Sequence, residues 1–326
     1  MVTRRSFVKG VAVAPVFGAA LSFAPSVSAQ SGNPIRVGSK DFPEAIIIGE
    51  MYALLLEGTG LTVERKLNLG GTAIAHEALV NGDLDVYPEY TGTGLLVVLE
   101  KTIADAVGAD FATPSASPAA GAAGEDTVVA VYNYVNQQYQ EQFSLVWLEQ
   151  TPMNNSQALA VTRQFSEENS VTTISQLVAL AGTTELTISA PSDFEEREDG
   201  LAGLRTVYGD FEAAVNGVAP GIKYQAFLDG DANVVLAFST DAEIAINDLI
   251  VLEDDKALWP PYRVAPVVRQ DALDANPTMA DALNALAPVL TTELMTAMNA
   301  RVIGDEKAEP ATVAMDFLVE QGLVAA

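Results

Sequence analysis

The most constraining feature of this sequence is an alternation of short strands and helices in its first hundred residues. Segments 35–38, 61–67 and 84–87 have the composition of strands. Between them, apolar residues recur at helical spacing from 43 to 55, and a second helix is expected over 73–80. Such alternation predicts an open α/β sheet whose binding loops lie at the carboxyl ends of the strands.

Polar residues follow the ends of these three strands. Lys40 comes after the first strand, with Asp41 placed to cap the next helix and Pro43 in its first turn. Gly71-Thr72 lies between the second strand and its helix. Residues 88–93 (PEYTGT) form the expected exit loop of the third strand. Because these strand ends share one edge of a sheet, we expect a single cleft to gather all three groups.

The alternation resumes in the second half of the chain. We expect a helix at about 128–142, strands near 145, after 154, and at 186–190, 234–238 and 264–268, and then two terminal helices. Residues 112–126 (ATPSASPAAGAAGED) have low complexity. They cannot bury enough apolar surface to become ordered, so we predict a mobile surface insert there.

Residue counts exclude several kinds of chemistry. The chain has no cysteine, which excludes disulfides, thiolate metal sites and cysteine nucleophiles. It has one histidine, His76, which disfavours histidine-based zinc sites and Ser–His–Asp triads. We therefore expect no metal, no cofactor and no role for His76 in a site. The net charge of −26 disfavours binding to nucleic acid or anionic lipid.

Residues 1–29 have the organisation of an export signal. Arg4-Arg5 opens a twin-arginine pattern, an apolar segment follows over 11–23, and Val27-Ser28-Ala29 offers a small-residue cleavage site. The apolar segment is short for a membrane span. We predict export by the twin-arginine route to the periplasm or the outer face of the cytoplasmic membrane, with the signal either cleaved or retained as an anchor.

A set of motifs in a fixed order resembles one protein family. The motifs are VGSKDF at 37–42, GEM at 49–51, RKLNLGGT at 65–72, GDLD at 82–85, YPEYTGT at 87–93, NN at 154–155, REDG at 197–200, STD at 239–241, LEDDK at 252–256 and PPY at 260–262. On these motifs the chain resembles the extracytoplasmic substrate-binding proteins of ABC importers for glycine betaine, choline and carnitine.

The resemblance implies a two-lobed α/β fold of the periplasmic-binding-protein type (type 2-like). Each lobe would contain a mostly parallel sheet flanked by helices, and the ligand would lie in the cleft between the lobes. Carried over to this chain, the first lobe would comprise 34–154 plus 260–326 and the second 155–259. Two crossover strands would join them.

The resemblance also implies which residues hold the ligand. Family members surround a quaternary ammonium group with tyrosine rings and bind the carboxylate with a lysine, an arginine and a threonine. The matching residues are Tyr90 and Tyr262 for the cage, and Lys40, Thr93 and Arg197 for the carboxylate. The chemistry agrees, because a quaternary ammonium has no N–H to donate and is held by aromatic faces. A carboxylate needs charged or hydroxyl donors.

Two cage positions depart from the family pattern. Gln157 stands where tyrosine is usual and has no aromatic face, whereas Phe238 keeps the ring but lacks the hydroxyl. A three-walled cage can still hold a trimethylammonium group, more weakly, or the Gln157 amide can face a hydroxyl or N–H group of the ligand. Arg197 lies among five acidic residues, so a local ion-pair network is the alternative to ligand contact.

We therefore predict a monomeric binding protein that captures a betaine-like solute with high affinity and delivers it to an ABC permease. Glycine betaine, carnitine, choline or a relative would be the ligand. One alternative is a protein of the same fold for a solute that is not fully methylated, such as ectoine or an amino acid. A two-lobed enzyme is more remote, because no acid and base are paired at the strand ends. An interaction or sensor domain is also disfavoured, because we expect such a protein to carry segments beyond the two lobes.

Overall fold

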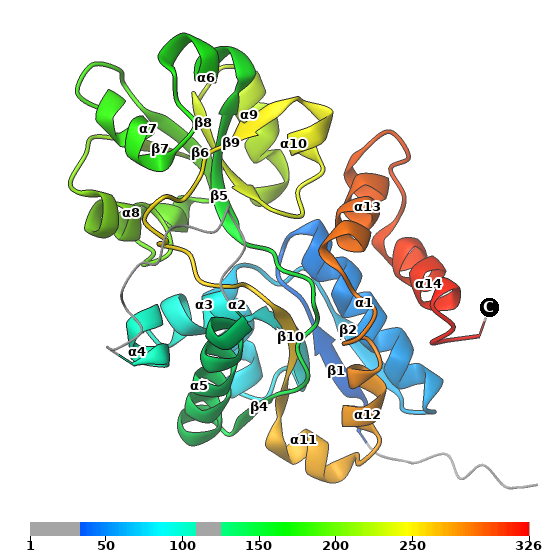
Figure 1. Cartoon of the computed structure of the whole chain (residues 1–326). Coiled ribbons are helices and arrows are strands. Elements are labelled where there is room, and N and C mark those ends of the chain that lie inside the picture. Colours follow the sequence, from blue (N-terminus) through cyan, green and yellow to red (C-terminus); the bar gives the residue numbers. More distant parts are fainter. Residues whose placement is uncertain (1–32, 109–124, 326) are drawn as a thin grey trace, which may run out of the picture. The chain divides into compact units, whose positions relative to one another are not determined.

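The computed structural model describes residues 33–108 and 125–325, and their strands form two five-stranded sheets (Figure 1). The first sheet has the order β2-β1-β3-β10-β4, and the second has the order β7-β6-β8-β5-β9. Strands β1 and β6 pair with their neighbours in parallel. Strands β10 and β5 pair with theirs antiparallel. The α/β class is as predicted, but the sheets are mixed rather than mostly parallel.

The chain builds most of the first sheet before it enters the second. The elements are β1 (Ile35–Gly38), α1 (Pro43–Gly58), β2 (Val63–Lys66), α2 (Thr72–Val80), β3 (Val86–Tyr90), α3 (Thr91–Thr93), the π-helical η1 (Gly94–Val98), α4 (Ile103–Val107), α5 (Glu125–Phe143) and β4 (Leu145–Trp147). The strand and helix predictions over 35–87 hold within a few residues at each boundary, whereas the sequence predicted neither η1 nor α4.

The second sheet is built from a continuous stretch of chain. Its elements are β5 (Gln157–Thr162), α6 (Arg163–Asn169), α7 (Ile174–Leu180), β6 (Thr187–Ala190), the 3₁₀ turn η3 (Ser192–Glu195), α8 (Leu201–Tyr208), β7 (Ala214–Gly217), η4 (Pro220–Ile222), α9 (Lys223–Leu228), β8 (Val234–Phe238), α10 (Glu243–Ile246) and β9 (Leu249–Val251).

The chain then returns to the first sheet. Its last elements are β10 (Val264–Arg269), α11 (Gln270–Ala275), α12 (Met279–Asn284), α13 (Thr292–Ile303) and α14 (Pro310–Glu320). The described residues therefore have four helices after β10, where the sequence predicted two. β5 and β10 are the first strands after each crossing between the sheets, and each runs antiparallel to both of its neighbours. This explains why both sheets are mixed.

Strand β3 extends further than the sequence predicted. Residues 88–90 continue the strand, and Thr91–Thr93 begins a helical turn, so the predicted exit loop over 88–93 is wrong. Pairing with β10, which lies far away in the sequence, decides this, because Val264 lies opposite Tyr90 and Pro266 opposite Pro88. The pairing of β3 with β1 covers one residue, Val86, so a proline at position 88 removes no hydrogen bond to β1.

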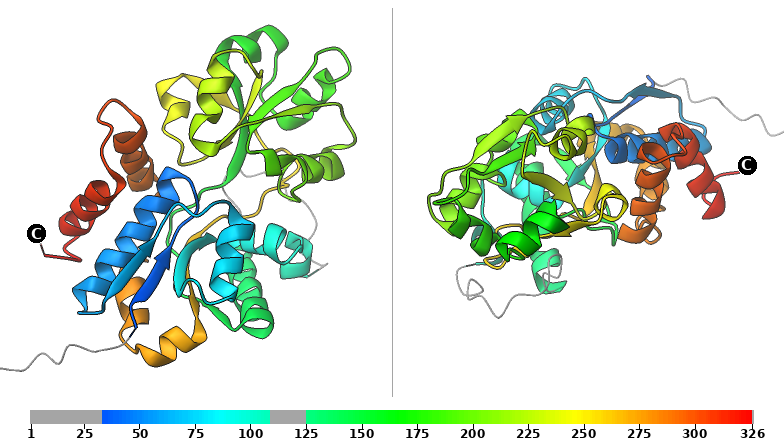
Figure 2. Two further views of the ribbon diagram at one scale, coloured as in Figure 1. Left: turned by 180° about the vertical axis from the view of Figure 1, so that it is seen from behind. Right: turned by 90° about the horizontal axis from the view of Figure 1, so that it is seen from above.

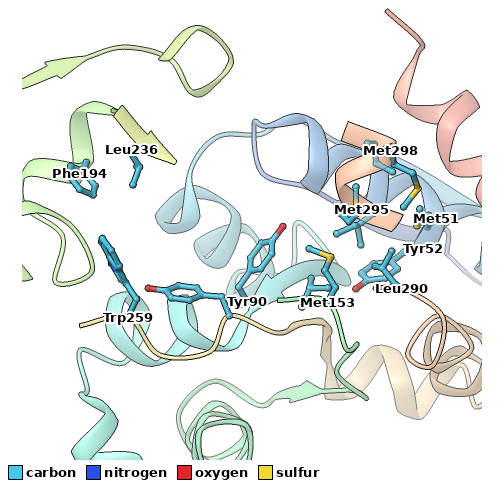
Figure 3. Close-up of a cluster of buried hydrophobic side chains, with 14 of the residues drawn as sticks. Met51, Tyr52, Tyr90, Met153, Phe194, Leu236, Trp259, Leu290, Met295 and Met298 are labelled. Carbon is cyan, nitrogen blue, oxygen red and sulfur yellow. The ribbon is translucent and has the colours of Figure 1, made fainter. Parts of the chain in front are cut away.

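Helix α1 lies at the centre of the core around the first sheet. Its residues are apolar around most of the circumference, as expected for a helix that is buried on all sides. It packs against β1, β2 and β3 on one side and against α12, α13 and α14 on the other (Figure 2). Met51 and Tyr52 lie near Met295 and Met298 of α13 in this core (Figure 3).

The start of α1 corrects one predicted detail. Pro43 is in the first turn, as expected, but the N-cap residue is Phe42 and no side chain caps the helix. Asp41 is one residue too early to act as the cap. It lies instead among the residues that line the cavity described below.

Two predicted features fall on residues that the structure does not describe. These are the export signal over 1–29 and most of the insert over 112–126, of which Glu125 and Asp126 begin α5. Within the described residues, no helix is both long enough and apolar enough to cross a membrane.

Candidate functional site

A cavity of about 640 Å³ lies at the strand ends of both sheets. Its walls include residues that follow β1, β6, β7 and β8. All seven residues singled out from the sequence line it: Lys40, Tyr90, Thr93, Gln157, Arg197, Phe238 and Tyr262. The expectation that one cleft gathers the polar strand ends is confirmed, because Gly71 and Thr72 line the same cavity.

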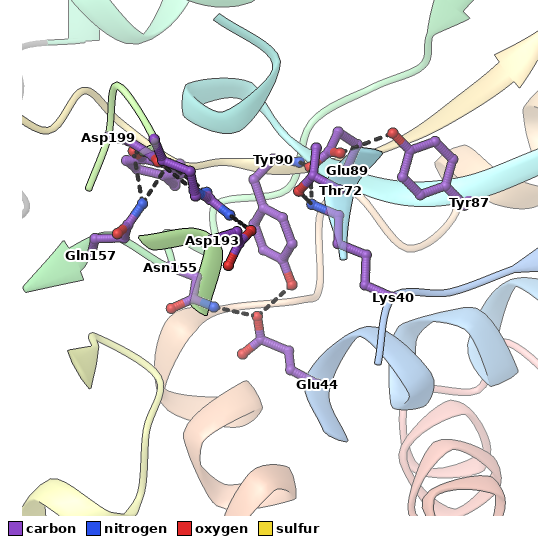
Figure 4. A network of polar contacts seen from close by, with 12 residues as sticks. Lys40, Glu44, Thr72, Tyr87, Glu89, Tyr90, Asn155, Gln157, Asp193 and Asp199 are labelled. Atoms are coloured by element: carbon purple, nitrogen blue, oxygen red, sulfur yellow. Dashed lines mark hydrogen bonds and ion pairs between the residues drawn. The ribbon is translucent and has the colours of Figure 1, made fainter. Parts of the chain in front are cut away.

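Lys40 is held by a buried carboxylate. Its Nζ donates to Glu89 Oε1 at 2.5 Å and to Thr72 Oγ1 at 3.0 Å (Figure 4). Glu89 is fully buried and also accepts from Tyr87 Oη and from the Tyr90 N–H. Burial lowers the pKa of Lys40, and the Glu89 carboxylate opposes that shift. An ammonium group has three donors, so one N–H of Lys40 stays free of these partners.

Arg197 lies in the ion-pair network that the sequence suggested as an alternative. Its Nε and Nη2 donate to the two carboxylate oxygens of Asp199 at 2.6 and 2.7 Å, and Nη1 donates to Asp193 at 3.3 Å. Burial is the largest single influence and would lower the pKa of Arg197, but the charge and hydrogen bonds of Asp199, together with the charge of Asp193, outweigh it and raise that pKa. A guanidinium has five N–H donors, so two are left for a ligand.

Asp199 joins three of the candidate residues. It is fully buried, and its Oδ2 also accepts from Gln157 Nε2 at 2.5 Å and from Tyr262 Oη at 3.3 Å. Its backbone carbonyl accepts from Trp259 Nε1 at 2.8 Å. The amide nitrogen of Gln157 is therefore engaged by protein partners, which leaves its oxygen as the group able to accept from a ligand.

Glu44, in the first turn of α1, is a buried carboxyl group on the cavity wall. It accepts hydrogen bonds from Tyr90 Oη and Asn155 Nδ2, both at 2.6 Å (Figure 4). It also accepts from Asn299 Nδ2 at 3.1 Å. These donors are neutral, and no lysine or arginine of the described chain forms an ion pair with it. Burial raises the pKa of Glu44 above its ordinary value.

Gly92 permits the close packing of Tyr262. A Cβ atom at position 92 would lie 2.8 Å from three ring atoms of Tyr262. The close neighbour of this glycine is therefore the ring of a candidate cage residue.

We predict that Gly92→Ala destabilises the protein by about 1–3 kcal/mol, because the added methyl group must displace the Tyr262 ring. Urea unfolding would measure this change. Gly58→Ala is the matched control, since a Cβ there meets nothing within 4 Å. We expect that variant to be unchanged or slightly more stable. Equal stabilities of the two variants would contradict the close packing at Gly92.

Sequence reasoning did not identify Glu44, Asp199 and Lys223 as residues of the site. Asp199 was visible as one of several acids around Arg197, but the sequence gives no sign of which acid forms the buried pair. Lys223 follows the end of β7 and the turn η4. The expectation that residues after strand ends line the cleft, which identified Lys40, therefore applies to Lys223 as well.

The remaining expectations concern metal and histidine chemistry. In the described part of the chain, no three His, Asp or Glu side chains are grouped so as to hold a metal ion. His76 packs edge-to-face against Tyr139 and Phe143, with ring centroids 5.4 and 4.8 Å apart. It does not line the cavity.

Comparison with protein families gives one match, which spans most of the chain. Residues 33–320 match the OpuAC model, described as the substrate-binding domain of ABC-type glycine betaine transport systems.

Two curated relatives and one solved structure are similar over about nine-tenths of this chain. The glycine betaine-binding protein YehZ of Escherichia coli is 30% identical over 92% of this chain and 94% of its own length. The ergothioneine transport permease/binding protein EgtU of Helicobacter pylori is 30% identical over 89% of this chain, which spans 48% of that relative. The structure of apo YehZ superposes with a TM-score of 0.59 at 27% identity, covering 90% of this chain and all of that one.

Proposed function

Since this chain belongs to the OpuAC family, the substrate-binding domains of ABC-type glycine betaine transport systems, we propose how its cavity holds a solute. The protein is an extracytoplasmic substrate-binding protein and not an enzyme. It binds solutes of the glycine betaine, carnitine and choline type for ABC import. The fold is that of the type 2 periplasmic binding proteins.

The ligand is a betaine-like zwitterion that lies in the 640 Å³ cavity. Its ammonium group lies against the rings of Tyr90 and Tyr262, with Phe238 and Gln157 as the further walls. Its carboxylate accepts from the free N–H groups of Lys40 and Arg197 and from the Thr93 hydroxyl. One observation carries this proposal, which is that aromatic and basic residues separated by up to 222 positions line a single cavity.

Glu44 supports the assignment of a cationic ligand group. A buried carboxylate is normally paired with a cation, because its charge is costly to remove from water. Glu44 has neutral donors, and one of them is the hydroxyl of the cage residue Tyr90. A cation held against the Tyr90 ring would supply a counter-charge that no described lysine or arginine gives Glu44 through an ion pair, and it would oppose the rise in the Glu44 pKa that burial causes.

The remaining proposals concern the mature protein and its partner. Residues 34–154 plus 260–326 form the first lobe and residues 155–259 form the second, and the two lobes close over the ligand. The chain leaves the cytoplasm by the twin-arginine route, guided by residues 1–29. It then acts as a monomer that delivers its solute to an ABC permease.

Isothermal calorimetry of the folded, mature protein tests the ligand assignment. The panel is glycine betaine, carnitine, choline, ergothioneine and ectoine. We expect heat from at least one ligand that carries both a trimethylammonium group and a carboxylate, and weaker binding of choline. Ergothioneine belongs in the panel because it carries both groups and a relative is named for it.

The possible outcomes separate the alternatives. Heat from ectoine alone would support the alternative ligand that is not fully methylated. No heat from any ligand, with folding shown by circular dichroism, would overturn the proposal.

A further inference from the structure

Lys223 is a second lysine of the cavity wall, on a helix that packs against the second sheet, whereas Lys40 follows a strand of the first. Lys223 is the first residue of α9, its side chain is 7% exposed, and it lines the cavity. Its backbone carbonyl accepts from the Ser189 hydroxyl at 2.7 Å, which ties the start of α9 to β6. The position of this side chain is therefore set by the sheet and not by a free loop.

The ammonium group of Lys223 lies over a candidate cage ring. Its Nζ is 4.2 Å from the centroid of the Phe238 ring and 5.0 Å from that of Tyr224. A cation within about 6 Å of a ring centroid makes the contact that a quaternary ammonium ligand would otherwise make with that ring. Lys40 lies over Tyr90 at 5.3 Å, close to that limit, so it competes less for the Tyr90 ring than Lys223 competes for the Phe238 ring.

One carboxylate oxygen fixes this arrangement. Asp241 Oδ2 accepts from Lys223 Nζ at 2.9 Å, from Tyr224 Oη at 2.7 Å and from the Phe238 N–H at 2.9 Å. The same acid therefore holds the lysine and the backbone of the ring that the lysine covers. Two N–H groups of Lys223 are left after this bond, because an ammonium has three donors.

We propose that Lys223 sets the ligand specificity of the cavity by occupying the Phe238 ring, so that this subsite rejects a quaternary ammonium group and accepts an oxygen of the ligand. The inference rests on the proposed betaine binding and adds to it. The trimethylammonium group is confined to the side of Tyr90 and Tyr262. A ligand that can place a carboxylate near Lys223 is favoured over a cationic ligand, such as choline, that has no anionic group.

Calorimetry of Lys223→Met with choline and glycine betaine tests this inference. Removing the ammonium frees the Phe238 ring and leaves the Asp241 charge beside it, so we expect choline to bind about 2- to 30-fold more tightly. Glycine betaine should gain less, because it loses a donor to its carboxylate. The measured quantity is the ratio of the two affinities. Lys223→Arg keeps the charge and should keep the wild-type ratio.

Lys256→Met is the matched control outside the cavity. Lys256 also lies over an aromatic ring, with its Nζ 5.0 Å from the centroid of Tyr208, but it does not line the cavity. Its removal should leave both affinities unchanged. The double variant Lys223→Met/Phe238→Leu should lose the gain in choline affinity, because the ring itself is then absent.

The outcomes distinguish this inference from the proposed function. If the wild type binds glycine betaine and the affinity ratio is the same in Lys223→Met, the specificity role is wrong and the betaine site stands. If neither protein binds any ligand while folded, both are wrong. Should Lys223→Met fail to fold, Lys223→Gln also removes the charge but keeps a polar side chain. The same change in the ratio of the two affinities is then expected of Lys223→Gln.

Discussion

Asp199→Ala should destabilise the protein by about 3–5 kcal/mol, the cost of removing one partner from a buried ion pair. Asp199 is fully buried, and its carboxylate accepts from both the Nε and the Nη2 of Arg197. Its loss leaves the guanidinium with Asp193 as its remaining acidic partner, and it leaves Gln157 and Tyr262 without their shared acceptor. Chemical denaturation in urea measures the change in the free energy of unfolding.

Asp193→Ala is the control for the same arginine. Asp193 also pairs with Arg197, but its side chain is 55% exposed and the contact is longer, at 3.3 Å. A surface ion pair of this kind contributes about 0–1 kcal/mol. Similar losses in the two variants would contradict the assignment of Asp199 as the buried partner. We also expect Asp199→Ala to weaken ligand binding, since Asp199 orients three residues of the cavity wall.

The α/β class and most elements could be predicted from the sequence because their signals are local. The apolar periodicity of residues 43–55 indicated α1. The predicted strand over 35–38 has the same bounds as β1. Because binding loops follow the carboxyl ends of strands, the sequence also predicted that Lys40, Thr72 and Tyr90 line one cavity, without any distance between them being known.

Features decided by distant pairing could not be predicted in the same way. The segment 88–93 has the proline, glycine and threonines of a loop, yet its first part is a strand because β10 pairs with it. The mixed sheets have a similar origin, since the direction of β5 and β10 depends on how the chain crosses between the sheets. No local pattern in the sequence predicts how the chain crosses from one sheet to the other.

Side-chain partners across the cavity were equally inaccessible. The sequence predicted that Gln157 either leaves the cage with three walls or turns its amide to the ligand, whereas its amide nitrogen is bound by Asp199, 42 residues away. The Lys223 ammonium lies over Phe238, although helix α9 and most of strand β8 separate the two residues in the sequence. Such contacts depend on the packing of α9 against β6 and β8, which a single sequence does not specify.

The pair formed by Lys40 and Glu89 should behave as a buried unit in a double-mutant cycle. Both side chains are at most 4% exposed, so solvent screens their interaction little. We expect Lys40→Met to cost about 3–5 kcal/mol, because it leaves the Glu89 carboxylate buried with neutral donors alone. In Lys40→Met/Glu89→Gln the uncompensated charge is also gone. The double variant should therefore be more stable than Lys40→Met, as measured by urea unfolding.

The sign of the coupling energy in this cycle separates a charge effect from a packing effect. If Lys40 contributes mainly through its alkyl chain, removing the charge of Glu89 brings no recovery, and the two single losses add within about 0.5 kcal/mol. Recovery in the double variant shows instead that the protein keeps a costly buried charge in order to hold the Lys40 ammonium at the cavity wall. Ligand affinity gives the second reading, because the double variant has lost the Lys40 donor. We expect it to be stable and yet to bind a carboxylate ligand more weakly than the wild type, with a smaller loss for choline.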